Sequence, residues 1–373
     1  MLSFSSKIAL SLPLLGLVSQ VAASPAPLFG RADSSDNTVT DLETCDCGFV
    51  DATDDAETVY TTYYRMDFTS SDWTRADLAK QFRMSNSTIY RPDSSPYARD
   101  FSPDQINLTA DGLNLVVSPP AELTNGSSVH CGGIYSKTED FGFGSYHLTG
   151  KVTEQAGVVN AFFVYKNDTS EVDMEYVSRD AKSQQFVRES VKPQIYEANG
   201  AASPLTYQRD FYTGNGEISD EFHEWAFKWT PSDVTFALDG NYTNKLTSNV
   251  PQDRGLFALS AWSDGGSTYS QGPPTVNATF LVSQVWVLYN STTTPIPAAN
   301  LNGDHSKATA MTCSARKTPC YVRAPQGTNN GLQSSSSGQS GAAKSGASSL
   351  WIPSHVAGVV AAASLFLGAA FVL

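Results

Sequence analysis

The stretch Ser170-Glu171-Val172-Asp173-Met174-Glu175-Tyr176 alternates acidic and apolar side chains. A period of two is typical of a β-strand with one buried face, so the pattern predicts a strand whose three carboxylates share one side. Like charges about 7 Å apart repel by roughly 1 to 2 kcal/mol even at an effective dielectric constant of 20 or more. Fold stability gives little reason for this arrangement, which favours a chemical role.

Retaining hydrolysis of a glycosidic bond requires two carboxyl groups with different pKa values, about 5 to 5.5 Å apart. On a straight strand the Cα atoms of Glu171 and Glu175 lie about 13 Å apart. Two glutamate side chains that lean inward on a bent strand can close this gap, so the spacing is compatible with retention. The alternative is an amphipathic strand whose acids only solvate one face.

Short runs rich in β-branched and aromatic residues recur along the chain and are separated by turn signals such as Asp239-Gly240. Many short strands at such spacing predict an all-β sandwich or barrel. One short helical turn is expected over Ser71–Ala79, capped by Ser71. The predicted strands are Thr58–Tyr64, Leu113–Val117, Gly144–Val152, Val158–Tyr165, Glu171–Val177, Trp225–Trp229, Val234–Leu238, Leu256–Trp262 and Phe280–Tyr289.

Both ends of the chain carry targeting patterns. Residues 1–23 combine a lone Lys7, an apolar run and small residues before Ser24, which predicts a secretory signal peptide. Residues 346–373 end in an uncharged apolar tail behind small-residue triplets, which predicts a glycosylphosphatidylinositol (GPI) attachment signal; the alternative is a C-terminal membrane helix. We therefore expect a protein that is lipid-anchored at the cell surface.

Composition divides the remainder of the chain. Residues 24–44 are polar and predict a pro-segment or a disordered arm, and residues 293–345 are rich in Ser, Gly and Ala and predict a flexible stalk. Between them, residues 45–292 are expected to form one globular unit.

Seven glycosylation sequons suit secretion, namely Asn86, Asn107, Asn125, Asn167, Asn241, Asn277 and Asn290. Five cysteines in an oxidising compartment leave one thiol over, and we expect Cys313 to pair with Cys320 and Cys131 to pair with Cys45 or Cys47. The histidines do not cluster, so no metal site and no cofactor are expected. The net charge of −13 argues against nucleic acid as a partner.

The acidic stretch and three segments around it resemble glycoside hydrolase family 16. Glu171-Val172-Asp173-Met174-Glu175 is similar to the E-x-D-x-E motif of that family. The flanking segments agree in order and spacing: Phe143–Val152, Phe222–Gly240, and Leu259–Trp262 with Gly265-Gly266 and Val285–Val287. The likeness covers about residues 139–290. It implies a curved antiparallel β-jelly-roll sandwich of the concanavalin A-like lectin/glucanase type.

Residue by residue, the resemblance implies Glu171 as nucleophile, Glu175 as general acid/base, and Asp173 as the helper that hydrogen-bonds the nucleophile. Burial and clustered charge should raise at least one pKa, and the three acids should titrate as a coupled set. For substrate binding we expect Trp262, Tyr269 and His147, although core packing of Trp262 and a structural role for His147 remain alternatives. Tyr269 stands where the family often has an aromatic-Ala-Gly-Gly sequence.

The implied protein is a monomeric, retaining glycoside hydrolase that acts on β-1,3- or β-1,3/1,4-glucan in cell-wall remodelling at a fungal-type surface. One alternative is a wall transglycosylase that crosslinks glucan or chitin and glucan. A second is a lectin-like wall-binding protein without catalysis, and a third is a structural mannoprotein.

Overall fold

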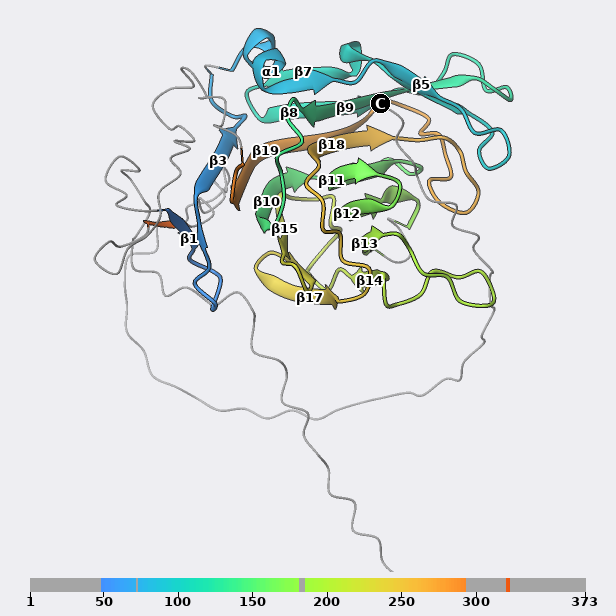
Figure 1. Cartoon of the computed structure of the whole chain (residues 1–373). Coiled ribbons are helices and arrows are strands. Elements are labelled where there is room, and N and C mark those ends of the chain that lie inside the picture. The colour runs from blue at the N-terminus through green and yellow to red at the C-terminus, as the bar shows by residue number, and fades with distance from the viewer. Residues whose placement is uncertain (1–47, 72, 181–184, 293–319, 323–373) are drawn as a thin grey trace, which may run out of the picture.

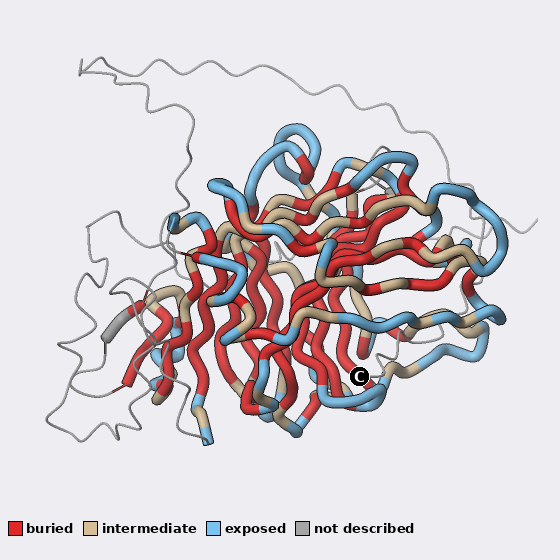
Figure 2. The backbone as a smooth tube through the Cα atoms, turned by 90° about the horizontal axis from the view of Figure 1, so that it is seen from above, coloured by how far each residue is buried: buried red, intermediate tan, exposed pale blue. Residues whose placement is uncertain are grey.

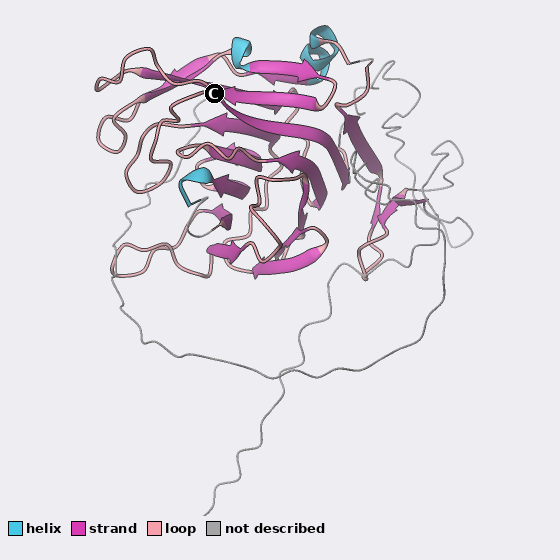
Figure 3. Cartoon of the chain, turned by 180° about the vertical axis from the view of Figure 1, so that it is seen from behind, coloured by secondary structure: helices cyan, strands magenta, loops and turns pink. Residues whose placement is uncertain are grey.

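The structure is a computed structural model that describes residues 48–71, 73–180, 185–292 and 320–322. Two large sheets lie one over the other (Figure 1). Seen from behind, the few helical turns are short and peripheral (Figure 3). The predicted all-β sandwich is confirmed.

The sheet that holds the acidic strand, here called the acid sheet, has the order β14-β13-β12-β11-β18-β9-β6-β5, with β4 also paired to β9. All its pairs are antiparallel except β6 with β9. Its strands are β4 (Phe82–Met84), β5 (Ser87–Ile89), β6 (Ala98–Phe101), β9 (Ser128–Ser136), β11 (Val159–Asn167), β12 (Ser170–Val177), β13 (Phe186–Lys192), β14 (Tyr207–Phe211) and β18 (Leu256–Trp262).

The other large sheet, here called the opposite sheet, is antiparallel in the order β17-β16-β15-β10-β19-β8-β7, with β3 also paired to β19. Its strands are β3 (Thr62–Asp67), β7 (Ile106–Thr109), β8 (Gly112–Val117), β10 (Gly144–Lys151), β15 (His223–Trp229), β16 (Val234–Leu238), β17 (Asn241–Leu246) and β19 (Ala278–Tyr289).

A small third sheet covers the outer face of the opposite sheet. It joins β1 (Phe49–Asp51), β2 (Val59–Tyr60) and β20 (Cys320–Val322), and β20 runs parallel to β1. A buried cluster fixes it in place through Phe49, Tyr60, Tyr63, Trp286, Leu288 and Val322. Because β20 lies within residues 293–345, part of the segment that we expected to be a stalk is a strand.

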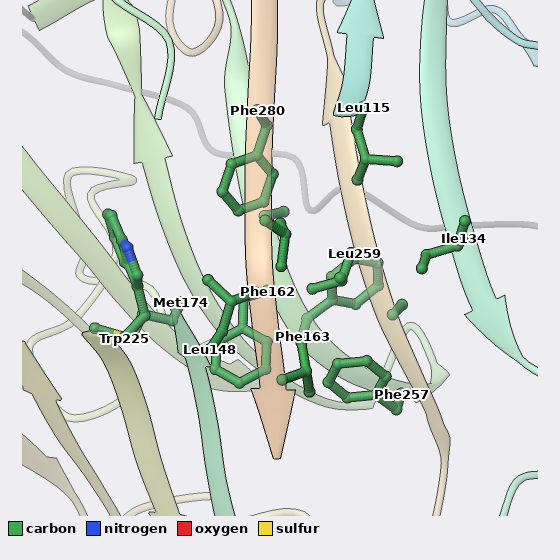
Figure 4. Packing of buried hydrophobic residues seen from close by; sticks show 14 of the residues in the cluster. Leu115, Ile134, Leu148, Phe162, Phe163, Met174, Trp225, Phe257, Leu259 and Phe280 are labelled. Atoms are coloured by element: carbon green, nitrogen blue, oxygen red, sulfur yellow. The ribbon is translucent and has the colours of Figure 1, made fainter. Parts of the chain in front are cut away.

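The hydrophobic core fills the space between the two large sheets. Burial follows the strands through the centre of the molecule (Figure 2), and the core side chains of Figure 4 come from both sheets. Phe162 of β11 and Phe227 of β15, for example, pack across the interface with ring centroids 5.0 Å apart. Since the inner face of the acid sheet is used for packing, its other face is available for a site.

The predicted helical turn exists, but it begins later than we expected. Helix α1 spans Arg75–Gln81, and its N-cap is Thr74 rather than Ser71. Thr74 and Asp77 form a reciprocal capping box, in which each side chain accepts from the backbone N–H of the other. This pairing decides where the helix starts. Elsewhere in the described residues there are two short helical turns, η2 (Pro103–Gln105) and η3 (Ser178–Asp180).

The prediction that Cys131 pairs with Cys45 or Cys47 is wrong, because Cys131 is a free and fully buried thiol. Its Sγ donates to the carbonyl of Val129 at 3.3 Å, and burial raises the pKa of the thiol to about 12. Cys45 and Cys47 lie outside the described residues. So does the predicted bridge between Cys313 and Cys320, because Cys313 and the side chain of Cys320 are not described.

The predicted targeting segments also fall outside the described residues. These are the signal peptide (1–23), the arm (24–44), the stalk (293–345) apart from β20, and the anchor signal (346–373). Among the residues that are described, no helix has the length and apolar character needed to cross a bilayer.

Candidate active site

Strand β12 sorts its side chains onto two faces. Val172, Met174 and Tyr176 belong to the core between the sheets. Because side chains alternate along a strand, Glu171, Asp173 and Glu175 lie together on the outer face of the acid sheet, here called the acid face. Glu171 is 2% exposed and Asp173 is 7% exposed, and Glu175 has intermediate exposure. The predicted grouping of the three acids on one face is therefore present.

Strand β13 supplies the polar partners of the acids. Lys192, Ser190 and Arg188 stand directly opposite Glu171, Asp173 and Glu175, respectively. The Nζ of Lys192 lies 3.6 Å from Glu171 Oε2, and the hydroxyl of Ser190 donates to Asp173 Oδ2 at 2.7 Å.

Strand β13 is not among the strands predicted from the sequence. Its sequence Phe186-Val187-Arg188-Glu189-Ser190-Val191-Lys192 carries polar residues at every second position, which is the same signal that revealed β12. The strand was overlooked because Glu189, on the core side, interrupts the apolar set. The buried Glu189 is held by Thr243 Oγ1 at 2.5 Å and by Asn244 Nδ2 at 2.7 Å, both from β17.

Burial dominates the electrostatics of the acids. It raises the pKa of Glu171 well above its usual range, and the negative charge of Asp173 adds to this effect. Burial also raises the pKa of Asp173, against the opposing effects of Lys192 and Ser190. The pKa of Glu175 rises to about 7, mainly through burial and then through Asp173. Glu175 is thus suited to carry a proton near neutral pH.

Lys192 balances part of this negative charge. Lys192 is 9% exposed, and its ammonium group interacts with Glu171, Asp173 and Glu175. The charges of these acids together raise the pKa of Lys192 despite burial. In return it favours the ionised form of each acid. Lys192 Nζ lies 3.6 Å from Glu171 Oε2, so its charge favours the carboxylate form of Glu171 and opposes the effects of burial and of Asp173.

Two of the three predicted substrate-binding residues reach the acid face. Trp262 is the last residue of β18 and pairs with Val159 of β11, which in turn pairs with Val177 of β12. Val177 lies two residues after Glu175, so Trp262 is on the same face of the sheet as Glu175. The hydroxyl of Tyr269 donates to Glu175 Oε2. Trp262 is only 2% exposed, with the Tyr269 ring stacked at 6.0 Å and the Arg99 guanidinium 4.4 Å from its ring centroid. The Trp262 side chain is therefore packed among protein groups, which is the alternative that the sequence left open for this residue.

His147 does not join the acid face, and its assignment to the substrate site is corrected. It lies on β10 of the opposite sheet, where Tyr146 and Leu148 fill the core and His147 points outward under β1. Its ring stacks on Trp286 with centroids 3.6 Å apart. Nε2 lies 3.0 Å from Asp51 Oδ2, and Nδ1 lies 3.0 Å from Glu224 Oε1. The sequence did not reveal which sheet its strand would join.

His147 is expected to stabilise the fold without affecting substrate affinity. Burial would lower its pKa, but Asp51 and Glu224 outweigh burial and raise the pKa to about 9. A raised histidine pKa stabilises the folded state fully below pH 6.5, and this contribution is lost as the pH rises through about 9. His147→Gln should therefore lower the free energy of unfolding by about 3 kcal/mol at pH 6 and by less at pH 9.5, in chemical denaturation.

A matched control is His130→Gln, because His130 also pairs with an aspartate, Asp100, at 3.1 Å, but its side chain is 45% exposed. That variant should change stability by no more than about 0.5 kcal/mol. A rise in KM for His147→Gln with unchanged stability would contradict the structural role.

Among the described residues, no three His, Cys, Asp or Glu side chains form a group that could hold a metal ion.

Comparison with known proteins identifies the family of the chain. The profile of "Glycosyl hydrolases family 16" matches residues 87–279, just over half of the chain, and the chain belongs to this family. A β-glucanase of Paenibacillus polymyxa is 26% identical over 230 residues, which are 60% of this chain and 84% of the relative.

Solved structures of similar fold include a Bacillus licheniformis β-glucanase, with a TM-score of 0.47 and 16% identity, covering 61% of this chain and 98% of that one. Another is the Crh5 transglycosylase, with a TM-score of 0.44 and 18% identity, covering 61% of this chain and 84% of that one.

Proposed function

We propose that the protein is a retaining glycoside hydrolase that acts on β-1,3- or β-1,3/1,4-glucan. The observation that carries the proposal is the acid face itself, where the buried Glu171 and Asp173 and the partly buried Glu175 meet one ammonium group and one serine hydroxyl. Membership of family 16 supports the reaction class, and the β-glucanase relative supports the substrate.

In the first step, Glu175 donates its proton to the glycosidic oxygen while the carboxylate of Glu171 attacks the anomeric carbon. The bond to the leaving sugar breaks, and a covalent glycosyl ester forms on Glu171. Lys192 helps to keep Glu171 ionised before the attack. Asp173, which accepts from the Ser190 hydroxyl, shares one proton with Glu171 in a hydrogen bond; with this proton on Asp173, it donates to the Glu171 carboxylate and orients the nucleophile.

In the second step, Glu175 acts as a base and removes a proton from the incoming hydroxyl group, which attacks the anomeric carbon and releases Glu171. Water as the acceptor gives hydrolysis, and a sugar hydroxyl gives transglycosylation, the alternative function. Two inversions at the same carbon preserve the β configuration.

We further propose a secreted, monomeric protein that is anchored to the plasma membrane by a GPI lipid and acts on the adjacent cell wall. The apolar tail with its small-residue triplets, the signal-peptide pattern and the seven sequons support this location. An anchored enzyme meets the polymer beside its own membrane, which suits remodelling of a fungal-type wall.

The reaction is tested by incubating the purified protein with end-labelled β-1,3- and mixed-linkage gluco-oligosaccharides and separating the products by length. Hydrolysis predicts shorter products alone, whereas transfer predicts longer products as well. Binding to glucan without any product from glucan or chitin substrates would contradict both enzymatic functions and favour the lectin-like alternative. The absence of any binding would favour the structural mannoprotein.

A further inference from the structure

Tyr269 contacts Glu175 and two neighbouring side chains. Its hydroxyl donates to Glu175 Oε2, its ring stacks on Trp262 of β18 with centroids 6.0 Å apart, and the guanidinium of Arg188 on β13 is 5.7 Å from its ring centroid. The loop after β18 thus brings a tyrosine to one oxygen of the residue that the proposed mechanism uses as acid and base.

The loop that carries Tyr269 is held in place by a polar network around the buried Asp264. This carboxylate accepts from Ser270 Oγ at 2.7 Å, from the N–H of Gly266 at 3.0 Å, and from Ser95 Oγ at 2.9 Å. The backbone N–H of Tyr269 also donates to the carbonyl of Gly266 at 3.1 Å.

A second tie comes from outside the loop, where Arg179 Nη1 donates to the carbonyl of Thr268 at 2.6 Å. The residues on both sides of Tyr269 are therefore anchored, and the direction of its hydroxyl is set by the fold.

We propose that Tyr269 is a positioning residue for Glu175. Its hydroxyl donates a hydrogen bond to Oε2 of Glu175, so that the transferable proton is held on Oε1. The inference rests on the proposed function. A carboxyl group whose second oxygen already accepts a hydrogen bond cannot rotate freely, so the proton-bearing oxygen keeps one orientation toward the glycosidic oxygen. When the proton leaves, the same hydrogen bond stabilises the carboxylate that forms.

Other charged and titratable groups also face Glu175, and they set the background for this effect. Asp173 and Glu171 of β12 disfavour its ionised form, whereas Arg188 and Lys192 of β13 favour it. On β14, Tyr207 interacts with Glu175. Arg209, also on β14, pairs with Arg188, which itself pairs with Glu175. Tyr269 donates a hydrogen bond directly to Glu175 Oε2, and Tyr269→Phe removes this contact alone.

The test is Tyr269→Phe, which removes the hydroxyl group and keeps the ring in the stack. We expect the basic limb of the kcat/KM–pH profile to move up by about one pH unit, because the carboxylate of Glu175 loses a donor. At the pH optimum, kcat should fall by about ten-fold with little change in KM, since the proton is no longer held in one orientation. Carbon-13 NMR titration of the Glu175 carboxyl group, assigned with Glu175→Gln, should show the same upward shift without relying on turnover.

The matched control is Tyr90→Phe, because Tyr90 is 45% exposed. It should leave the pH profile unchanged. An unshifted basic limb and an unshifted carboxyl titration in Tyr269→Phe would overturn the positioning role, as would a loss of activity that only follows a loss of stability. If Glu175→Gln itself keeps full activity, the proposed function fails; if only Tyr269→Phe behaves like the parent protein, the present inference fails alone.

Discussion

Replacement of Glu171 by Gln is expected to reduce kcat on β-glucan by about 10⁴- to 10⁶-fold, because the amide cannot form the glycosyl ester. The variant should fold normally. Burial and Asp173 make the ionised form of Glu171 costly, so a neutral side chain of the same shape relieves repulsion. Steady-state kinetics together with denaturant unfolding measure both effects.

The matched control is Glu139→Gln, because Glu139 is a half-exposed glutamate that pairs with Lys166 and with none of the three acids. It should keep its full activity. If Glu171→Gln retained more than a few per cent of the parent kcat, another group would have to be the nucleophile.

Replacement of Glu175 by Gln should have an effect that depends on the leaving group. On β-glucan, where the departing sugar needs a proton, kcat/KM is expected to fall by about 10²- to 10⁴-fold. With a dinitrophenyl glycoside, whose leaving group needs no proton, the glycosyl enzyme should form quickly and accumulate, which gives a burst of dinitrophenol. Stopped-flow absorbance measures this burst.

Azide provides the second half of that experiment. A small anion can attack the glycosyl enzyme without a base, so azide should restore turnover of Glu175→Gln and yield a β-glycosyl azide. Equal losses on both substrates, with no rescue, would contradict the acid/base role. In the parent protein, the pKa of about 7 for Glu175 predicts a basic limb near neutral pH, because protonated Glu175 is needed for the first step.

The acid strand could be predicted from the sequence because its information is local. Alternation of acidic and apolar residues fixes both the strand and its two faces, and the core position of Met174 agrees with that reasoning. Most of the other predicted strands agree with the observed ones for the same reason, since they bury one side in the core between the two large sheets. The predicted strand Thr58–Tyr64 is an exception, because the structure divides it into β2 and β3, which belong to different sheets.

Contacts that depend on strand pairing could not be obtained in this way. Lys192 and Arg188 are near the acids only because β13 pairs with β12 in one particular register, and no local pattern specifies that register. Tyr269 was selected from its position after Trp262, but its hydrogen bond to Glu175 depends on the Asp264 network.

The substrate-binding role predicted for His147 was wrong because it too depended on contacts between strands. Its strand was recognised correctly, but the sequence did not show that its outward face would be covered by β1, where Asp51 binds the ring. The disulfide predicted for Cys131 was wrong for a related reason. The sequence around a cysteine does not show whether its thiol will be buried in the sandwich or bonded to another cysteine.

The most direct test of the central claim is to trap the covalent intermediate. A 2-deoxy-2-fluoro β-gluco-oligosaccharide with a dinitrophenyl leaving group should form a slowly hydrolysed ester, which peptide mass spectrometry can locate. We predict one sugar adduct for each protein molecule, attached to Glu171 and absent from Glu171→Gln. Attachment to Glu175 or to another residue, or turnover that releases an α-configured product without any adduct, would contradict the account.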